Sequence, residues 1–283
     1  MKRALALLLV WSASMSGHGQ TAAQSPQKYF QRFFSGDLNH KKIVVWGNST
    51  VSFEDEFFRT LAKHAAPGDV LEGLQVAPEV DNTEVGSASS PSRNQNGHIH
   101  RLGNIINMGN NGGNLRGMLG TPGGSLFYRI DAVCSEAPDL LILRGPLIND
   151  VRMGTCDLDC AKGLEKQMLD RITACSPKTD VLLLAENSLL TTDVGKHGYI
   201  SPETPEAAQA YSTILRDAIL SFHGIYPNVD VMDLQEELYG ATSVAASPYM
   251  HDQLHPAPEG QQKEAELVIE RLRRSRQPRP KPR

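Results

Sequence analysis

Short apolar runs alternate with segments of helical periodicity along most of this chain. Five runs of four to six residues are mainly apolar and rich in Leu or β-branched residues, as expected of strands covered on both faces. They lie at 43–46, 104–107, 140–143, 181–185 and 229–234. Apolar residues recur every three or four positions at 53–65 and at 265–272, which predicts amphipathic helices. Strands that alternate with helices indicate βαβ units around a parallel sheet.

The N-terminus has the order of a secretory signal peptide. Lys2 and Arg3 precede an apolar run at 4–11, and small residues follow up to position 23. The apolar run is shorter than the roughly 20 residues that a membrane-spanning helix needs. A buried N-terminal helix is the alternative. We expect residues 1–23 to be removed and the mature protein to be secreted or periplasmic.

Charge is distributed unevenly along the chain. Residues 271–283 contain seven Lys or Arg and no acidic residue, which predicts a disordered, Pro-rich basic tail that could contact an anionic polymer or a membrane surface. Residues 24–270 carry 19 basic and 32 acidic residues, a net charge of −13, although the whole chain carries only −4. An acidic body argues against nucleic acid as a partner. We expect residues 24–270 to form one monomeric domain.

The cysteines number four, an even count that is compatible with two disulfides in an oxidising compartment. Four cysteines allow three connectivities. Zinc is the alternative, but the Cys-x3-Cys spacing is unusual for a zinc site and no His lies among the four. We prefer Cys134 with Cys175 and Cys156 with Cys160, because Cys134 and Cys175 each precede an apolar run and could end neighbouring helices.

The first candidate for chemistry is Ser49, in the segment Gly-Asn-Ser-Thr that directly follows the strand at 43–46. A Ser at a strand-to-helix turn lies at the carboxyl edge of a parallel sheet, where ligands bind in open α/β folds. The free N–H groups of a helix N-terminus favour a developing negative charge. The alternative is that Ser49 only caps the helix.

A general base is available near the C-terminus, in the segment Asp252-x-x-His255. A hydroxyl nucleophile needs a base, and a carboxylate on the other ring nitrogen fixes the tautomer of the imidazole. His251 competes for the role of base but has no Asp at the equivalent spacing. The alternative is a capping Asp beside an incidental surface His.

Two further segments, at 107–114 and 145–150, combine Gly and Asn directly after apolar strands. Acyl transfer needs N–H donors aimed at an oxyanion, and Gly backbone amides and Asn side-chain amides can supply them. Taken separately, both segments are also compatible with ordinary glycine turns and Asn caps.

The order of these four segments, with Ser, Gly, Asn and finally Asp-x-x-His, resembles the GDSL or SGNH hydrolase family over residues 41–260. The resemblance implies an α/β fold, a flavodoxin-like three-layer α/β/α sandwich on a five-stranded parallel sheet. It also implies that Ser49 is the nucleophile, that His255 is the general base and then acid, and that Asp252 orients His255. The oxyanion donors would be the N–H of Ser49, the N–H of Gly112 and the side-chain amide of Asn149.

The segments depart from the family in three ways. Asn48 and Thr50 stand where the family name implies Asp and Leu, on either side of the nucleophile. Three residues separate Gly145 from Asn149, where the family often has one. In the second segment, Gly109, Gly112 and Gly113 compete for the donor role; Gly112 is preferred because the family's donor lies five residues beyond the Asn that ends the strand.

The resemblance implies an exported carboxylic ester hydrolase that works through an acyl-enzyme without metal or organic cofactor. We expect a small ester or an acylated glycan as substrate, since export favours an O-acetyl or O-acyl esterase of a polysaccharide. The alternatives are a lipase, lysophospholipase or thioesterase, an O-acyltransferase, or a non-catalytic glycan-binding protein of the same fold.

Overall fold

The structure is a computed structural model, and it describes residues 41–52, 54–65, 75–76, 99–110, 112–121, 129–152, 154–185, 205–239, 249–250 and 255–274. The predicted signal peptide and most of the predicted tail lie outside the described residues. Asp252 and His251 lie outside them as well.

The described residues form one seven-stranded sheet in the order β2-β3-β4-β1-β5-β6-β7. Its strands are β1 (Ile43–Gly47), β2 (Gln75–Val76), β3 (Ile99–Leu102), β4 (Ile105–Gly109), β5 (Leu140–Arg144), β6 (Asp180–Leu184) and β7 (Val229–Met232). Five neighbouring strands, β4, β1, β5, β6 and β7, are parallel. On the other side of β4, β3 and then β2 are added as antiparallel strands. The five parallel strands confirm the predicted fold, and the antiparallel pair is an addition to it.

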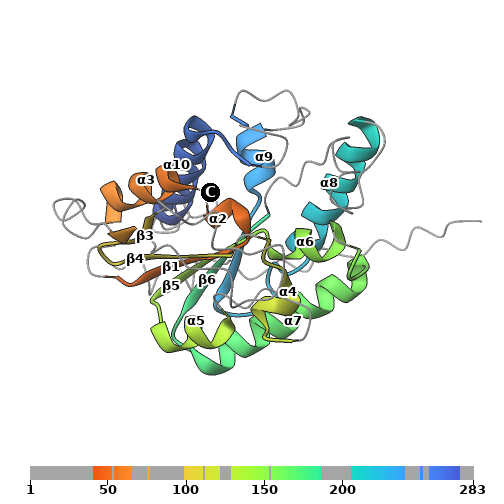
Figure 1. Cartoon of the computed structure of the whole chain (residues 1–283), viewed down its shortest axis with the longest axis horizontal. Helices are drawn as coiled ribbons and strands as arrows, with labels where there is room; N and C mark the ends of the chain where they lie inside the picture. The colour runs from red at the N-terminus through yellow and green to blue at the C-terminus, as the bar shows by residue number, and fades with distance from the viewer. Residues whose placement is uncertain are drawn as a thin grey trace, which may run out of the picture.

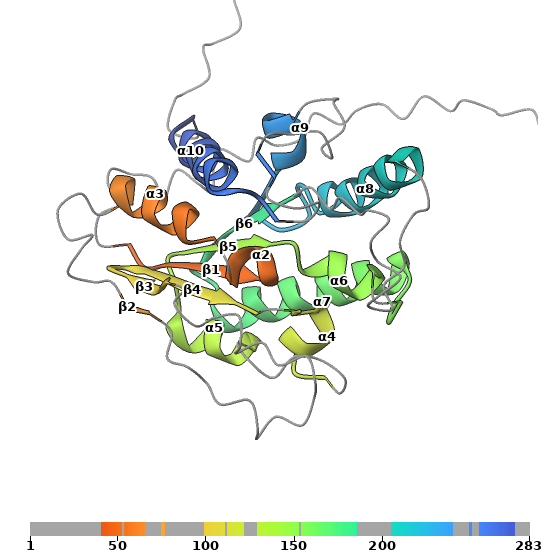
Figure 2. The same ribbon diagram turned by 45° about the horizontal axis from the view of Figure 1, so that its top comes forward.

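Helices cover both faces of the sheet, which completes the predicted three-layer sandwich (Figures 1 and 2). Their bounds are α2 (Ser49–Ser52), α3 (Asp55–Ala65), α4 (Leu115–Met118), α5 (Ile130–Glu136), α6 (Pro146–Arg152), α7 (Leu158–Cys175), α8 (Pro205–Leu220), α9 (Leu234–Tyr239) and α10 (Pro258–Arg274). Helices α3 and α10 pack together on one face, and α5 and α7 lie on the other.

The two faces of β1 show why the parallel strands are apolar throughout. Val44 and Trp46 belong to the core under α5 and α7, whereas Ile43 and Val45 belong to the core under α3 and α10. Successive side chains of a strand point to opposite faces, so a strand covered on both sides needs apolar residues at every position. All five residues of β1 are buried.

The order of the parallel strands places a topological switch point at β1. β1 lies between β4 and β5, so the connections that follow β1 and β4 diverge at the carboxyl edge of the sheet. In open α/β sheets this is where a ligand crevice forms. Helix α2 packs directly on the end of β4, since a Cβ added at Gly109 would lie 2.3 Å from the backbone nitrogen of Ser52.

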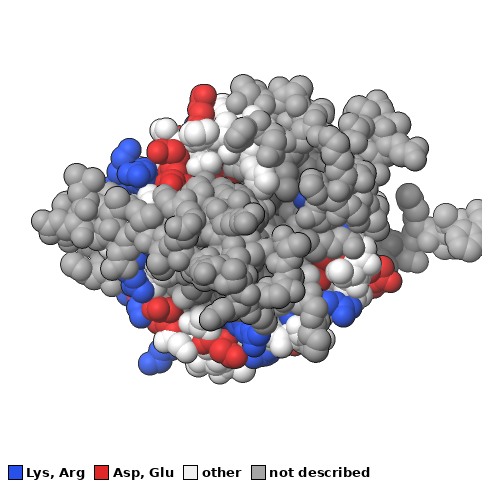
Figure 3. Space-filling view, in the orientation of Figure 1, with Lys and Arg blue, Asp and Glu red and all other residues white. Residues whose placement is uncertain are grey.

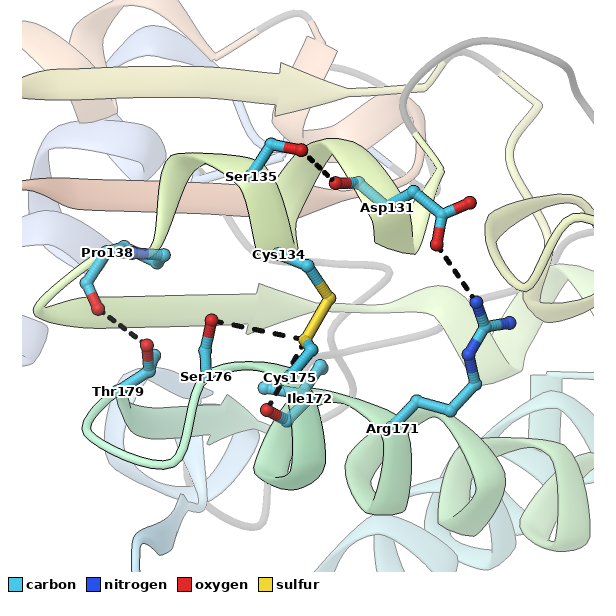
Figure 4. The surroundings of a disulfide bond; sticks show 9 residues. All are labelled: Asp131, Cys134, Ser135, Pro138, Arg171, Ile172, Cys175, Ser176 and Thr179. Atoms are coloured by element: carbon cyan, nitrogen blue, oxygen red, sulfur yellow. Dashed lines mark hydrogen bonds and ion pairs between the residues drawn. A yellow bond between two sulfur atoms is a disulfide. The ribbon is translucent and has the colours of Figure 1, made fainter.

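Two disulfides join described residues, Cys134 to Cys175 and Cys156 to Cys160, which confirms the preferred pairing. Cys134 lies in α5 and Cys175 ends α7, with their Cα atoms 5.7 Å apart. Figure 4 shows that an ion pair between Arg171 and Asp131 joins the same two helices beside the disulfide.

Removing the Cys134–Cys175 disulfide should destabilise the protein more than removing Cys156–Cys160. The sequence separations are 41 and 4 residues, and the entropy that a cross-link removes from the unfolded chain grows with the closed loop. We expect Cys134→Ala/Cys175→Ala to lower the free energy of unfolding by about 2 kcal/mol more than Cys156→Ala/Cys160→Ala. Urea denaturation under non-reducing conditions measures both; equal losses would contradict the expectation.

The basic C-terminal segment begins inside the fold. Helix α10 continues to Arg274, so the first four residues of the predicted tail, 271–274, belong to it. Arg271 donates to both carboxylate oxygens of Asp230, which is buried in β7. The predicted boundary between domain and tail therefore falls within a packed helix.

The described surface has mixed charge. Acidic and basic side chains are interspersed on the face drawn in Figure 3. Large exposed apolar side chains are limited, in the described part of the chain, to Ile214 and Ile225. No helix among the described residues is long and apolar enough to cross a membrane.

Candidate active site

Ser49 is the first residue of α2, where the chain leaves β1 at the carboxyl edge of the sheet. Asn48 holds this turn with both ends of its side-chain amide. Its Oδ1 accepts from the backbone N–H (3.0 Å) and the hydroxyl (2.7 Å) of Thr50, and its Nδ2 donates to the carbonyl of Gly145 at 2.7 Å. An ionised Asp could accept from Thr50 but could not donate to Gly145. The departures at positions 48 and 50 thus form one hydrogen-bonded unit.

His255 meets Ser49 from the other end of the chain. Its Nε2 lies 3.0 Å from Ser49 Oγ, although 206 residues separate them in sequence. Ser49 is buried and the imidazole is half-buried. This is the distance at which a general base can take the proton of a hydroxyl nucleophile.

The segment that carries His255 is held against the start of α10. The backbone N–H of Ala257 donates to the carbonyl of Tyr249 at 2.7 Å, and Met250 forms an isolated bridge with Pro256. Gly260 allows this approach, because a Cβ added there would lie 2.2 Å from the Tyr249 carbonyl oxygen. Asp252 lies between these anchored ends but outside the described residues, so its orienting role stays a prediction.

Among the three competing glycines, the described hydrogen bonds distinguish Gly112. The N–H of Gly109 donates to Asn107 Oδ1 at 2.8 Å, and the N–H of Gly113 donates to the Asn110 carbonyl at 2.7 Å. The N–H of Gly112 has no hydrogen bond within the described part of the chain. Gly112 also has φ +67° with open space around a virtual Cβ, so its backbone conformation is the reason for a glycine here.

Asn149 lies on α6 with its side chain buried. One hydrogen of its amide is donated to the carbonyl of Gly113 at 2.7 Å. Since a side-chain amide has two N–H bonds, the other is available for a ligand oxygen. The backbone N–H of Ser49 likewise has no hydrogen bond to any described residue. The three predicted donors are therefore all chemically able to serve an oxyanion.

Two carboxyl groups near Asn149 are fully buried, and the sequence did not single out either. Asp150 follows Asn149 directly, and burial raises its pKa to about 6. Glu165 projects from α7, where burial, and then the nearby Asp150, raise its pKa to about 8. Neither oxygen of Glu165 has a hydrogen-bond partner among the described residues. At neutral pH, Glu165 is therefore mostly protonated.

Glu165 should make stability depend on pH. A carboxyl whose pKa is higher in the folded state than in the unfolded state binds its proton more tightly when folded, so stability is lost as pH rises from about 4.5 to about 8. We expect the free energy of unfolding to fall, relative to Glu165→Gln, by on the order of 3 kcal/mol between pH 5 and pH 8. Urea denaturation of both proteins at the two pH values checks this, and parallel pH curves would contradict it.

A buried cluster of charge connects the elements that carry Ser49 and His255. The guanidinium of Arg144, at the end of β5, contacts the carboxylates of Glu54 and Glu264. Glu54 lies between α2 and α3, and Glu264 lies on α10. All three side chains are buried. An Arg that ends an apolar strand was the only sequence signal of this cluster.

Comparison with known proteins agrees with the fold. No family model matches the chain, and no curated protein matches its sequence. Solved structures do match. A peptidoglycan O-acetylesterase is 14% identical with a TM-score of 0.58, over 88% of this chain and 95% of its own. A Bacteroides fragilis NCTC 9343 protein assigned as an acylhydrolase is 17% identical with a TM-score of 0.51, and the match covers 89% of this chain and 97% of that protein.

The chain therefore has the fold of the SGNH hydrolases, as its resemblance to that family implied. Within that fold, the side chains predicted as nucleophile and base are in hydrogen-bonding contact at the carboxyl edge of the sheet.

Proposed function

We propose that this protein is an exported serine esterase that cleaves carboxylic esters through an acyl-enzyme. The observation that carries the proposal is the 3.0 Å contact between Ser49 Oγ and His255 Nε2, at the start of α2, where the backbone N–H of Ser49 has no described partner. Imidazole is the common general base for a hydroxyl nucleophile, and free N–H groups nearby suit the oxyanion of acyl transfer.

In the proposed reaction, Ser49 Oγ attacks the ester carbonyl while its proton passes to His255 Nε2. The carbonyl oxygen becomes an oxyanion that accepts from the N–H groups of Ser49 and Gly112 and from the amide of Asn149. Collapse of this intermediate breaks the C–O bond, and the imidazolium returns the proton to the leaving alcohol. Water then attacks the acyl-enzyme, His255 takes its proton, and the carboxylic acid leaves as Ser49 is protonated again.

The substrate that we propose is an O-acetylated polysaccharide or glycan. Two disulfides and the predicted signal peptide favour an oxidising compartment outside the cytoplasm. A peptidoglycan O-acetylesterase shares the fold. A small acetyl group also needs less apolar surface around the nucleophile than a long acyl chain.

Hydrolysis of p-nitrophenyl esters of increasing chain length, beside acetate release from O-acetylated peptidoglycan and xylan, tests the proposal. Preference for acetyl esters and acetate release from a glycan would support it. A preference for long chains would favour a lipase or thioesterase, and transfer of the acyl group to an added sugar would favour an acyltransferase. If a fluorophosphonate fails to label the purified protein, the serine hydrolase mechanism is wrong and a non-catalytic glycan-binding role becomes the better proposal.

A further inference from the structure

Asp150 is fully buried, and its carboxylate binds a helix other than the one that carries it. It lies on α6, and its Oδ2 accepts the backbone N–H of Leu115, 35 residues earlier, in the first turn of α4. Helices α4 and α6 lie side by side next to α7 (Figure 2).

The segment that Asp150 holds leads directly from the proposed oxyanion donor. Gly112 and Gly113 are followed by Asn114, which caps α4 by accepting the N–H of Gly117 at 2.8 Å. Asn149 donates to the carbonyl of Gly113 at 2.7 Å. Two consecutive residues of α6, Asn149 and Asp150, therefore bind the two ends of the stretch from Gly113 to Leu115.

Asp150 is in turn fixed from the opposite side. The hydroxyl of Thr155 donates to the Asp150 carbonyl at 2.9 Å, and the Thr155 N–H donates to the same oxygen at 3.2 Å. Arg116 donates to the Thr155 carbonyl at 3.3 Å and contacts Cys160 Sγ, and the Cys156–Cys160 disulfide closes this turn. The Thr155 hydroxyl also lies 3.5 Å from Asp150 Oδ1, so Thr155 contacts both the backbone and the carboxylate of Asp150.

We propose that Asp150 is a positioning residue for the oxyanion hole. It fixes residues 112–115, which include the proposed donor Gly112, relative to Asn149. This inference rests on the proposed function. An ionised carboxylate binds backbone N–H groups more strongly than a neutral amide does. Donors to an oxyanion must be placed within a few tenths of an ångström, and a shift of about 1 Å can reduce the rate about 100-fold. Loss of the charge would therefore loosen the donors without removing them.

Asp150→Asn tests this, because it keeps the shape of the side chain and removes the charge. We expect kcat for p-nitrophenyl acetate at pH 7.5 to fall about 10-fold or more with KM changed less than about 3-fold, since the oxyanion exists only in the transition state and intermediate. Glu165→Gln is the matched control. It alters the neighbouring buried carboxyl, which does not contact α4 through any described hydrogen bond, and should leave kcat within about 3-fold.

A double-mutant cycle with Asn149→Ala separates positioning from a general loss of stability. If both residues act through the same donors, the rate losses will not multiply, and Asp150→Asn/Asn149→Ala will be little slower than Asn149→Ala alone. Losses that multiply fully, or a kcat of Asp150→Asn equal to that of wild type, would overturn the inference.

Two controls keep the outcomes distinct. A wild-type protein that neither hydrolyses esters nor reacts with a fluorophosphonate would contradict the proposed function itself. An active wild type beside a fully active Asp150→Asn would contradict only the role of Asp150. If Asp150→Asn does not fold, Thr155→Val decides: a lowered kcat at unchanged KM supports the positioning role, and an unchanged kcat overturns it.

Discussion

Replacement of Ser49 by Ala is expected to lower kcat for ester hydrolysis by about 10⁴-fold or more. The change removes the oxygen that would form the acyl-enzyme, and His255, whose Nε2 lies 3.0 Å from that oxygen, is left with no hydroxyl to deprotonate. The fold should be unaffected, because the main role of position 49 in the structure is to begin α2 with its backbone. His255→Ala should cause a loss of similar size, since residues of such a unit act together.

Steady-state hydrolysis of p-nitrophenyl acetate measures this loss, and circular dichroism of each variant monitors the fold. Ser135→Ala is the control. Its hydroxyl donates to the Asp131 carbonyl on α5, and its activity should equal that of wild type. Wild-type hydrolysis by Ser49→Ala would remove Ser49 as the nucleophile. Loss of fluorophosphonate labelling in Ser49→Ala but not in Ser135→Ala would locate the reactive serine.

The fold was predictable where burial on both faces imposes a simple pattern. Each of the five parallel strands begins within one residue of its predicted start, because positions such as Val44 and Val45 must be apolar to meet two different cores. The antiparallel strands β2 and β3 were not predicted. They are two and four residues long, and β3 contains His100 and Arg101 in half-buried positions, so apolar periodicity does not mark them.

The site was predictable where its chemistry depends on residue type and order. Ser49 and His255 are brought into contact from segments that sequence order alone singled out. Arg144 and Asp150 were not singled out as functional, because their importance comes from which backbone and carboxylate groups surround them after folding. For Asn48, the sequence showed the departure from the family pattern but not its reason. The reason is the hydrogen bond to the Gly145 carbonyl, which an amide can donate and a carboxylate cannot.

Arg144→Met is expected to destabilise the fold by about 4 kcal/mol. The guanidinium contacts the carboxylates of Glu54 and Glu264 in a region where all three side chains are buried, and it also lies 4.6 Å from the centre of the Phe57 ring. Methionine preserves much of the volume but removes the positive charge, so two carboxylates remain in the interior without the cation that neutralises them. The cost of an uncompensated buried charge exceeds that of losing an exposed ion pair several-fold.

Urea denaturation of Arg144→Met measures the loss, with Lys166→Ala as the matched control. Lys166 forms an exposed pair with Asp170 at 2.7 Å, and its removal should cost no more than about 0.5 kcal/mol. Restoring neutrality with Glu54→Gln and Glu264→Gln in the Arg144→Met background should recover part of the loss. A loss below about 1 kcal/mol in Arg144→Met would show that the buried charges are not coupled.

The same cluster links the two parts of the chain that bring Ser49 and His255 into contact, because Glu54 follows α2 and Glu264 lies on α10. We therefore expect esterase activity and folded structure to be lost at the same urea concentration.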